Sequence, residues 1–184
     1  INKQMKKKNV SIVIPILNEG KNIIRLVKQI KYIQNKINFI KFELIFIDDN
    51  SIDNTHILLR KIVKNKNFIR YYIRRNLKPD LSKSCTLGFE KARYENILVM
   101  DGDLQHPPKY IKNITEKYFK NNADIVIGSR NLIKKKNTGL SIFRYISSIL
   151  IIYVINFFLE NKTSDPLSGF FIFKKKIYKN NKYF

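Results

Sequence analysis

The sequence predicts an α/β domain, with a mostly parallel sheet flanked by helices on both faces. Short runs of apolar, β-branched residues alternate along the chain with segments in which apolar residues recur at helical spacing. Right-handed crossovers turn such a strand–helix repeat into a parallel sheet. The chain has 184 residues, 44% of them hydrophobic, which suits a single domain that buries its core without disulfides.

The expected strands are the apolar runs that precede polar loops. They cover residues 10–14, 42–47, 69–73, 96–100 and 124–127. Continuous β-branched runs of this length are typical of strands that are buried on both faces of a parallel sheet. We expect Pro15 to end the first of them.

The expected helices lie between these strands. They cover residues 19–34, 55–64, 82–93 and 108–121. In the first, Ile23, Leu26 and Ile30 form one apolar face. A further apolar helix is expected at residues 140–159, but Arg144 leaves it short of the roughly 20 apolar residues that cross a bilayer. We interpret it as a buried core helix, with an interfacial membrane helix as the alternative.

The chain is strongly basic. Lys and Arg number 36 against 14 Asp and Glu, so the formal net charge is +22. This charge indicates an anionic partner, whether nucleic acid, an anionic lipid surface or a phosphorylated substrate. Much of it is Lys scattered among Ile and Asn, so a compositional bias explains it equally well. Cys85 is the single cysteine and no leader-like segment opens the sequence, which favours a reducing, cytosolic setting.

Polar residues follow most of the expected strands at the point where each strand ends. In open sheets a ligand binds beyond the carboxyl ends of the strands. Those positions hold, in chain order, Asn18 and Glu19, then Asp48 to Ser51, then Asp101 to Asp103, then Ser129 and Arg130. The most carboxylate-dense points of the chain therefore fall where a ligand is expected.

Asp101-Gly102-Asp103 is the most informative motif, because it comes directly after an expected buried strand. Two carboxylates two positions apart can bind one hard cation, and Mg²⁺ takes one or two protein carboxylates together with substrate phosphates. Gln105 offers a neutral oxygen ligand. Such an ion would neutralise the charge on a departing diphosphate. The alternative is a turn with acidic residues ahead of a helix that Pro108 opens.

Asp48 and Asp49 follow another expected strand. Their acceptor oxygens suit the N–H groups of a base or the hydroxyls of a ribose. We interpret Asp53 or Asn54 as the N-cap of the next helix, which is compatible with that role. Glu19 is interpreted either as part of the same site or as a favourable charge at a helix N-terminus.

Together these motifs resemble glycosyltransferase family 2, and within it the branch of dolichyl-phosphate mannose synthases and bacterial polyprenyl-phosphate glycosyltransferases. Five segments match in order through almost the whole chain. They are SIVIP at 11–15 with Asn18 and Glu19, FIDDNSIDNT at 46–55, VMDGDLQHPP at 99–108, DIVIGSR at 124–130 and SDPLSGFF at 164–171. The resemblance implies a Rossmann-like GT-A fold, a nucleotide-sugar donor and a divalent metal, Mg²⁺ or Mn²⁺.

The resemblance also implies roles for individual residues. The nucleotide-sugar would contact Pro15, Leu17, Asn18, Glu19, Asp48, Asp49, Asp101 and Gly102. The metal would be held by Asp101, Asp103 and Gln105. The expected catalytic set is Asp103, with Arg130 and Arg144 at the phosphates and Asp165 on the acceptor side. His106 is instead expected to shape the Pro-rich loop, and Cys85 to be a small apolar helix residue.

The function implied is inverting transfer of a hexose, mannose or glucose, from a donor of the GDP-mannose or UDP-glucose type to a polyprenyl or dolichyl phosphate. The acceptor oxygen is already anionic, so little general-base assistance is needed. One alternative is a family 2 enzyme that acts on a sugar hydroxyl in a polysaccharide or cell-surface glycan. Another is a basic nucleic-acid-binding module, which leaves the strand-end carboxylates unexplained, so we expect no nucleic-acid partner.

The expected organisation is a basic N-terminal extension at residues 1–9 and one GT-A catalytic domain at residues 10–184. Family members continue past the SDPLSGFF segment, so the resemblance implies truncation at the C-terminus. We expect the protein at the cytoplasmic side of a membrane surface, attached peripherally or anchored through a missing C-terminal region. A homo-oligomer or a membrane partner subunit is compatible with that location.

Overall fold

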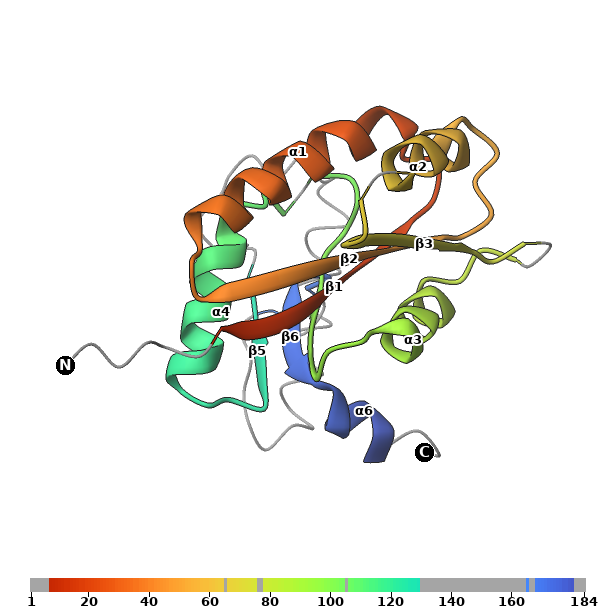
Figure 1. Cartoon of the computed structure of the whole chain (residues 1–184). Helices are drawn as coiled ribbons and strands as arrows, with labels where there is room; N and C mark the ends of the chain where they lie inside the picture. The colour runs from red at the N-terminus through yellow and green to blue at the C-terminus, as the bar shows by residue number, and fades with distance from the viewer. Residues whose placement is uncertain are drawn as a thin grey trace, which may run out of the picture.

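The computed structural model describes residues 7–64, 66–75, 78–104, 106–129, 165 and 168–180. Its centre is a six-stranded sheet with the strand order β3-β2-β1-β4-β6-β5 (Figure 1). The strands are β1 Lys8–Ile16, β2 Ile40–Asp48, β3 Ile69–Ile73, β4 Asn96–Val99, β5 Ile125–Ile127 and β6 Phe171–Lys174. The first four pair in parallel, whereas β6 pairs antiparallel with both β4 and β5. The predicted α/β fold with a mostly parallel sheet is therefore confirmed.

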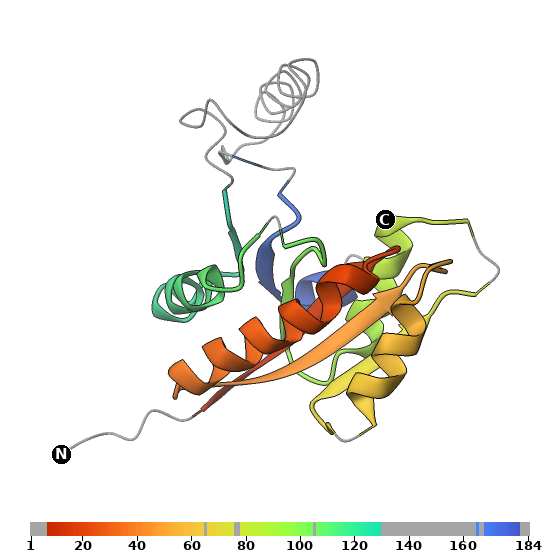
Figure 2. The same cartoon turned by 90° about the horizontal axis from the view of Figure 1, so that it is seen from above.

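Helices cover both faces of this sheet, as predicted. They are α1 Gly20–Lys36, α2 Thr55–Val63, α3 Leu81–Lys91, α4 Tyr110–Lys120 and α6 Lys175–Asn180. Figure 1 shows α1 and α2 on one face and α3 on the other. Seen from above, α4 lies beside the edge strand β5, whereas α2 lies near the other edge strand, β3 (Figure 2).

Two apolar clusters hold the layers together. Alternate residues of β1, from Val10 to Ile16, face the cluster under α1, α2 and α4, where Leu26 and Ile30 of α1 are fully buried. Val13 points the other way, into a smaller cluster completed by α3 and α6. Because β1 is buried on both faces, its run of apolar residues is continuous rather than alternating with polar ones.

The first strand does not stop at Pro15, which corrects the prediction. β1 continues to Ile16 and pairs with β2 along its whole length, with Pro15 opposite Ile47. The carbonyl of Val13 accepts a bond from the β4 side and the carbonyl of Ile16 from the β2 side. Pro15 therefore faces the β4 side, where pairing with β4 has already ended, so its missing N–H breaks no ladder bond.

The other predicted elements are present, with ends that differ by a few residues. β1 begins at Lys8, so the last two residues of the predicted extension 1–9 belong to the sheet. The sequence did not predict β6 or α6. The helix expected at 140–159 lies outside the described residues, and within the described part of the chain no helix is both long and apolar enough to cross a membrane.

The reversed direction of β6 has a consequence for the site. Phe171, at the start of β6, pairs with Val99, at the end of β4. The residues that precede β6 therefore lie at the carboxyl edge of the parallel strands. The Gly128 N–H donates to the Phe170 carbonyl (2.7 Å), and the Ser168 hydroxyl donates to the Gly128 carbonyl (2.6 Å).

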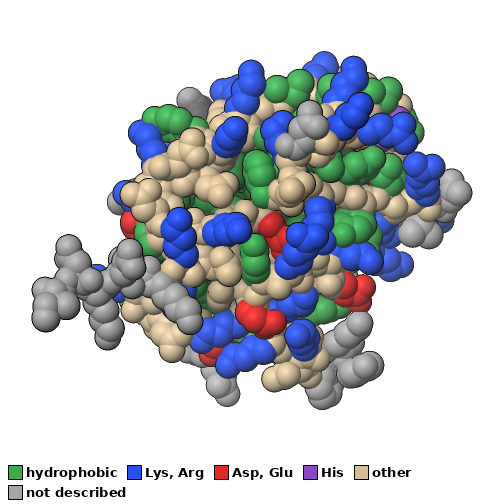
Figure 3. Space-filling view, viewed as in Figure 1, with side chains coloured by type: hydrophobic (Ala, Val, Ile, Leu, Met, Phe, Trp, Pro, Cys, Tyr) green, Lys and Arg blue, Asp and Glu red, His purple; other side chains and the backbone are tan. Residues whose placement is uncertain are grey.

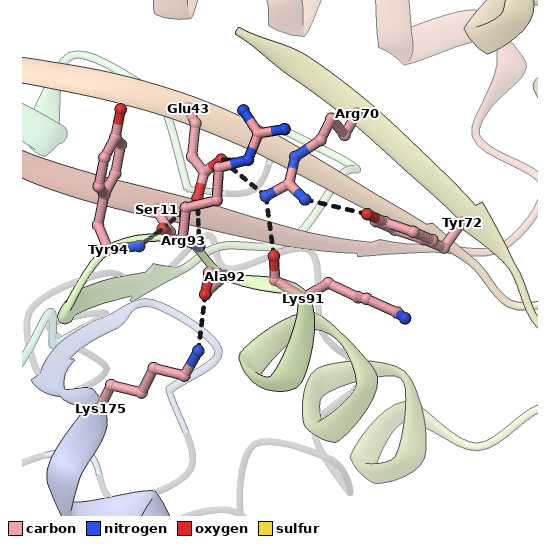
Figure 4. A network of polar contacts seen from close by, with 9 residues as sticks. All are labelled: Ser11, Glu43, Arg70, Tyr72, Lys91, Ala92, Arg93, Tyr94 and Lys175. Carbon is pink, nitrogen blue, oxygen red and sulfur yellow. Dashed lines mark hydrogen bonds and ion pairs between the residues drawn. The ribbon is translucent and has the colours of Figure 1, made fainter.

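Near the amino ends of the strands, the buried carboxylate of Glu43 organises a polar network (Figure 4). Glu43 accepts hydrogen bonds from the Ser11 hydroxyl (2.5 Å), the Arg70 guanidinium (2.7 Å) and the Arg93 N–H (2.8 Å). Arg70 also donates to the carbonyl of Lys91, at the end of α3 (2.8 Å). The network thus attaches the segment between α3 and β4 to side chains of β1, β2 and β3.

We predict that Glu43→Ala lowers the free energy of unfolding by about 2–3 kcal/mol, because the partly buried Arg70 guanidinium, the Ser11 hydroxyl and the Arg93 N–H lose their shared acceptor. Urea unfolding followed by circular dichroism measures this change. The matched control is Glu116→Ala, which removes the exposed helical pair with Lys112 and should change stability by about 0.5 kcal/mol or less. Equal effects of the two substitutions would contradict the structural role of Glu43.

Candidate active site at the carboxyl edge of the sheet

The loops after β1 and β2 are bonded into one unit. The Asn18 N–H donates to the Ser51 hydroxyl (2.8 Å), and the Ile52 N–H donates to the Asn18 side-chain oxygen (2.9 Å). Asn18 has a positive φ of 57°, a conformation that Asn tolerates better than most residues. Asn18 lies at the predicted edge of the sheet. Its side-chain oxygen accepts a hydrogen bond from the neighbouring loop.

Asp53 ties together the first turns of the two helices that follow these loops. Its carboxylate accepts from the Gly20 N–H (3.2 Å) and from the Thr55 N–H (2.9 Å). Partial burial opposes its ionisation, but the hydrogen bonds from Thr55 and Gly20 outweigh that effect and lower the pKa of Asp53. Asn54 occupies the N-cap position of α2, but its side chain makes no capping hydrogen bond. Of the two predicted capping residues, Asp53 is the one whose side chain accepts a hydrogen bond from the first turn of α2.

Asp48 ends β2 at this edge and Asp49 follows it, and both are buried. One Asp48 oxygen accepts from the Ser51 N–H (2.9 Å), and the other has no hydrogen-bond partner among the described residues. The Asp49 oxygens are engaged separately, one by the Arg74 guanidinium and the other by the Asp80 N–H (2.6 Å). Asp49 is therefore held in one orientation by residues that follow β3.

A pocket of about 210 Å³ opens beside Asp49. It is lined by Pro15, Ile16, Leu17, Asp49, Pro79, Asp80, Leu81 and Ser84. It unites three residues predicted to bind the nucleotide, Pro15, Leu17 and Asp49. Asn18, Glu19 and Asp48 do not line it, and the carboxylate of Glu19 accepts from the side chain of Asn22 (2.7 Å).

Asp101, Gly102 and Asp103 lie in the turn that follows β4 after Met100. A Cβ at Gly102 would lie 2.5 Å from the Ile16 side chain, so only glycine lets this turn pack against the end of β1. A Cβ at Gly169 would lie 2.6 and 2.7 Å from the two carboxylate oxygens of Asp101. The segment before β6 therefore approaches the Asp101 carboxylate as closely as a backbone can.

A second pocket of about 400 Å³ lies at this carboxylate. Asp101, Ser168 and Gly169 line one part of it, and α3 supplies a mainly apolar wall with Leu81, Ser82, Cys85, Thr86 and Phe89. Pro15 and Leu81 line both pockets. The two pockets are therefore neighbours, with a carboxylate in each, and an elongated ligand can occupy both.

Lys and Arg side chains spread over much of the face drawn in Figure 3 instead of gathering in one patch. Burial, together with the nearby charge of Asp101, raises the pKa of the Cys85 thiol to about 12. Cys85 packs against the smaller apolar cluster, so its predicted role as a small apolar residue is confirmed.

His106 is buried, and its ring stacks on Phe170 with centroids 5.5 Å apart. Its Nδ1 lies 3.4 Å from an Asp101 oxygen. The ring thus packs between the Pro-rich loop and the segment before β6, which agrees with the predicted role in shaping that loop.

The oxygen donors of the Asp101–Asp103 turn match a hard divalent cation, and the pocket of about 400 Å³ provides space beside the Asp101 carboxylate. No group of three or more His, Cys, Asp or Glu side chains with metal-binding geometry occurs among the described residues. Asp165 is fully buried, and its carbonyl accepts from the Ser168 N–H (3.2 Å). Gln105, Arg130 and Arg144 lie outside the described residues.

The sequence reasoning missed Arg74, Asp80 and Ser84, which meet around Asp49. A signal was present for Arg74. It directly follows the expected strand at 69–73, and polar residues at the ends of the expected strands are the feature that indicates the other site residues.

Glycosyl transferase family 2 matches residues 11–181 of this chain. A dolichol-phosphate mannosyltransferase of Pyrococcus furiosus is 33% identical over 91% of this chain and 47% of its own length. A dodecaprenyl-phosphate galacturonate synthase of Rhizobium johnstonii is 28% identical over 94% of this chain and 50% of its own length. The chain thus spans about half the length of these two curated relatives.

A solved structure shows the same fold at low sequence identity. It is the mannosyltransferase PcManGT from Pyrobaculum calidifontis in complex with GDP-Man and Mn²⁺. Its TM-score is 0.65 at 13% identity, over 95% of this chain and 46% of that chain. The family match over most of the sequence, the identity to the Pyrococcus protein and the ordered motifs agree, and the chain belongs to glycosyl transferase family 2.

Proposed function

We propose that this chain is the catalytic domain of an inverting glycosyltransferase that moves a hexose from a nucleotide-sugar to a polyprenyl phosphate. The observation that carries the proposal is the pair of neighbouring pockets, one containing Asp49 and the other Asp101. A nucleotide-sugar has the same two-part form, with a flat base at one end and a diphosphate and sugar at the other.

The base belongs in the pocket beside Asp49. Pro15, Leu17 and Leu81 supply apolar surface there for a flat ring. A carboxylate carries about four lone-pair positions, so Asp49 can accept an N–H from a base while it keeps its bonds to Arg74 and Asp80. Bases that present an N–H on the edge facing Asp49, as uracil and guanine do, suit this arrangement.

The diphosphate and sugar belong in the pocket beside Asp101. Asp101 and Asp103, with Gln105, would hold Mg²⁺ or Mn²⁺ there, consistent with the Mn²⁺ and GDP-Man of the similar Pyrobaculum structure. The ion supplies positive charge that stabilises a nucleoside diphosphate as it leaves. Gly169 keeps the Asp101 carboxylate accessible, because any larger residue would occupy the space at its oxygens.

The acceptor proposed is a polyprenyl phosphate, because the names of two relatives agree on that class. The Pyrococcus relative is named for dolichol phosphate and the Rhizobium relative for dodecaprenyl phosphate, whereas their sugars differ. A phosphate oxygen is anionic near neutral pH, so it can attack the anomeric carbon with little help from a general base. Arg130, Arg144 and the basic run at 134–136 would bind its charge, and Asp165 would act on the acceptor side.

With this acceptor, the location proposed for the chain is the cytoplasmic side of a membrane. The net charge of +22 would favour contact with anionic lipid headgroups. A partner subunit or a second copy could share that surface.

The test of the proposed function is an acceptor assay with radiolabelled GDP-mannose and UDP-glucose. Each donor is incubated with the protein, Mg²⁺ or Mn²⁺, and either a polyprenyl phosphate or an oligosaccharide. We expect label to move into the organic phase only with the lipid acceptor. Label on the oligosaccharide instead would favour the alternative enzyme, and binding to random nucleic acid without any donor binding would contradict sugar transfer.

We predict that Asp103→Asn abolishes the metal-dependent part of the thermal stabilisation by the donor, because one of the two carboxylates of the turn is lost. Differential scanning fluorimetry with and without Mn²⁺ measures it. The matched control is Asp124→Asn, which changes an exposed carboxylate next to β5 and should leave that stabilisation intact. Full metal-dependent stabilisation in Asp103→Asn would show that the metal binds elsewhere.

We predict that Gly169→Ala lowers the transfer rate by about 100-fold while the protein remains folded, because the new methyl group displaces the Asp101 carboxylate. Rates are compared per mole of folded protein, with folding checked by circular dichroism. A folded variant with the rate of the wild type would contradict the close approach at Asp101.

A further inference from the structure

We infer that Arg74 is the positioning residue that sets the geometry of the nucleotide pocket, an inference that rests on the proposed function. The residue directly follows β3, and its N–H donates to the Asp48 carbonyl (2.9 Å), which extends the β2–β3 ladder past Ile73. Its side chain is 5% exposed, so a charged group is almost completely buried at the edge of the site.

The Arg74 guanidinium connects three different parts of the chain. Its Nη1 contacts the Asp49 carboxylate, the Asp80 carbonyl (3.0 Å) and the Ser84 hydroxyl (3.2 Å). The Asp80 N–H returns to the other Asp49 oxygen (2.6 Å). Asp49 and the loop before α3 therefore hold each other through a closed ring of contacts that contains Arg74.

This ring also fixes the start of α3. Asp80 is the N-cap residue, and its carboxylate accepts from the Lys83 N–H (3.0 Å). Hydrogen bonding from the Lys83 N–H, and secondarily the charges of Lys83 and Arg74, lower the pKa of Asp80, so it stays ionised as a cap. Because Leu81 lines both pockets, the position of this first turn determines the wall that they share.

Burial of the Arg74 charge costs desolvation free energy and fixes the direction of the Asp49 carboxylate. An arginine taken out of water must be matched by charge and hydrogen bonds, and Asp49 with Asp80 and Ser84 supplies them. The result is a carboxylate whose direction is fixed before a ligand arrives. Preorganisation of this kind strengthens binding, because the complex no longer has to order the side chain.

The experiment compares Arg74→Met and Arg74→Lys with wild type by calorimetric titration of UDP and GDP in Mg²⁺. In Arg74→Met we expect the Kd of the nucleotide that binds wild type to rise by about tenfold, since Asp49 and the first turn of α3 lose their fixed positions. Arg74→Lys should show a smaller increase, because its ammonium keeps the charge but is one bond shorter. In the transfer assay KM for the donor should rise while kcat stays within about threefold.

The matched control is Arg75→Met, which removes the same charge from the exposed neighbour and should leave the Kd unchanged. If Arg74→Met does not fold, Arg74→Lys decides alone. A wild-type Kd in Arg74→Lys, or a lower melting temperature with unchanged Kd in either variant, would show that Arg74 only supports the fold. Failure of wild type to bind UDP or GDP would instead contradict the proposed function, and the inference would fall with it.

Discussion

The structure depends on the parallel alignment of β1 with β2 and β4. β1 lies between these two strands and is buried on both faces, so its neighbours can pair only in a fixed register. Parallel pairing brings the carboxyl ends of all three strands to one edge. Each loop that leaves that edge carries polar residues, and the sheet therefore gathers carboxylates that are far apart in the sequence.

Buried carboxylates near the two ends of the sheet have different tasks. Glu43, near the amino ends, accepts hydrogen bonds from Ser11, Arg70 and the Arg93 N–H. These bonds hold the segment between α3 and β4 against the sheet. Asp49, at the carboxyl end of the same strand, pairs with Arg74 but also lines a pocket. The same ionic chemistry thus supports the fold at one end and orients a candidate ligand-binding group at the other.

The antiparallel strand β6 completes the candidate site. Its direction brings Ser168 and Gly169 beside Asp101, although at least 65 residues separate them in the chain. Gly169 and Gly102 allow backbone segments to approach from two sides, where a Cβ would collide with Asp101 or with Ile16. Their place in the sequence motifs therefore has a steric reason in this chain.

The sequence by itself determined the α/β class, most of the strands and helices, and the edge at which the candidate site lies. These follow from local patterns, because apolar runs such as Val10 to Ile14 and the helical spacing of Ile23, Leu26 and Ile30 report burial residue by residue. Asp101 and the pair Asp48-Asp49 could be selected for the same reason, since each directly follows such a run.

Only the tertiary structure decided how these residues are used. It showed that β1 tolerates Pro15, because the side of the strand that lacks an N–H has no partner there. It showed that β6 runs antiparallel to its neighbours, and that Asp49 is bound by Arg74 and Asp80. Such contacts join segments distant in the chain, and their geometry is set by packing between layers, which no local pattern of residues records.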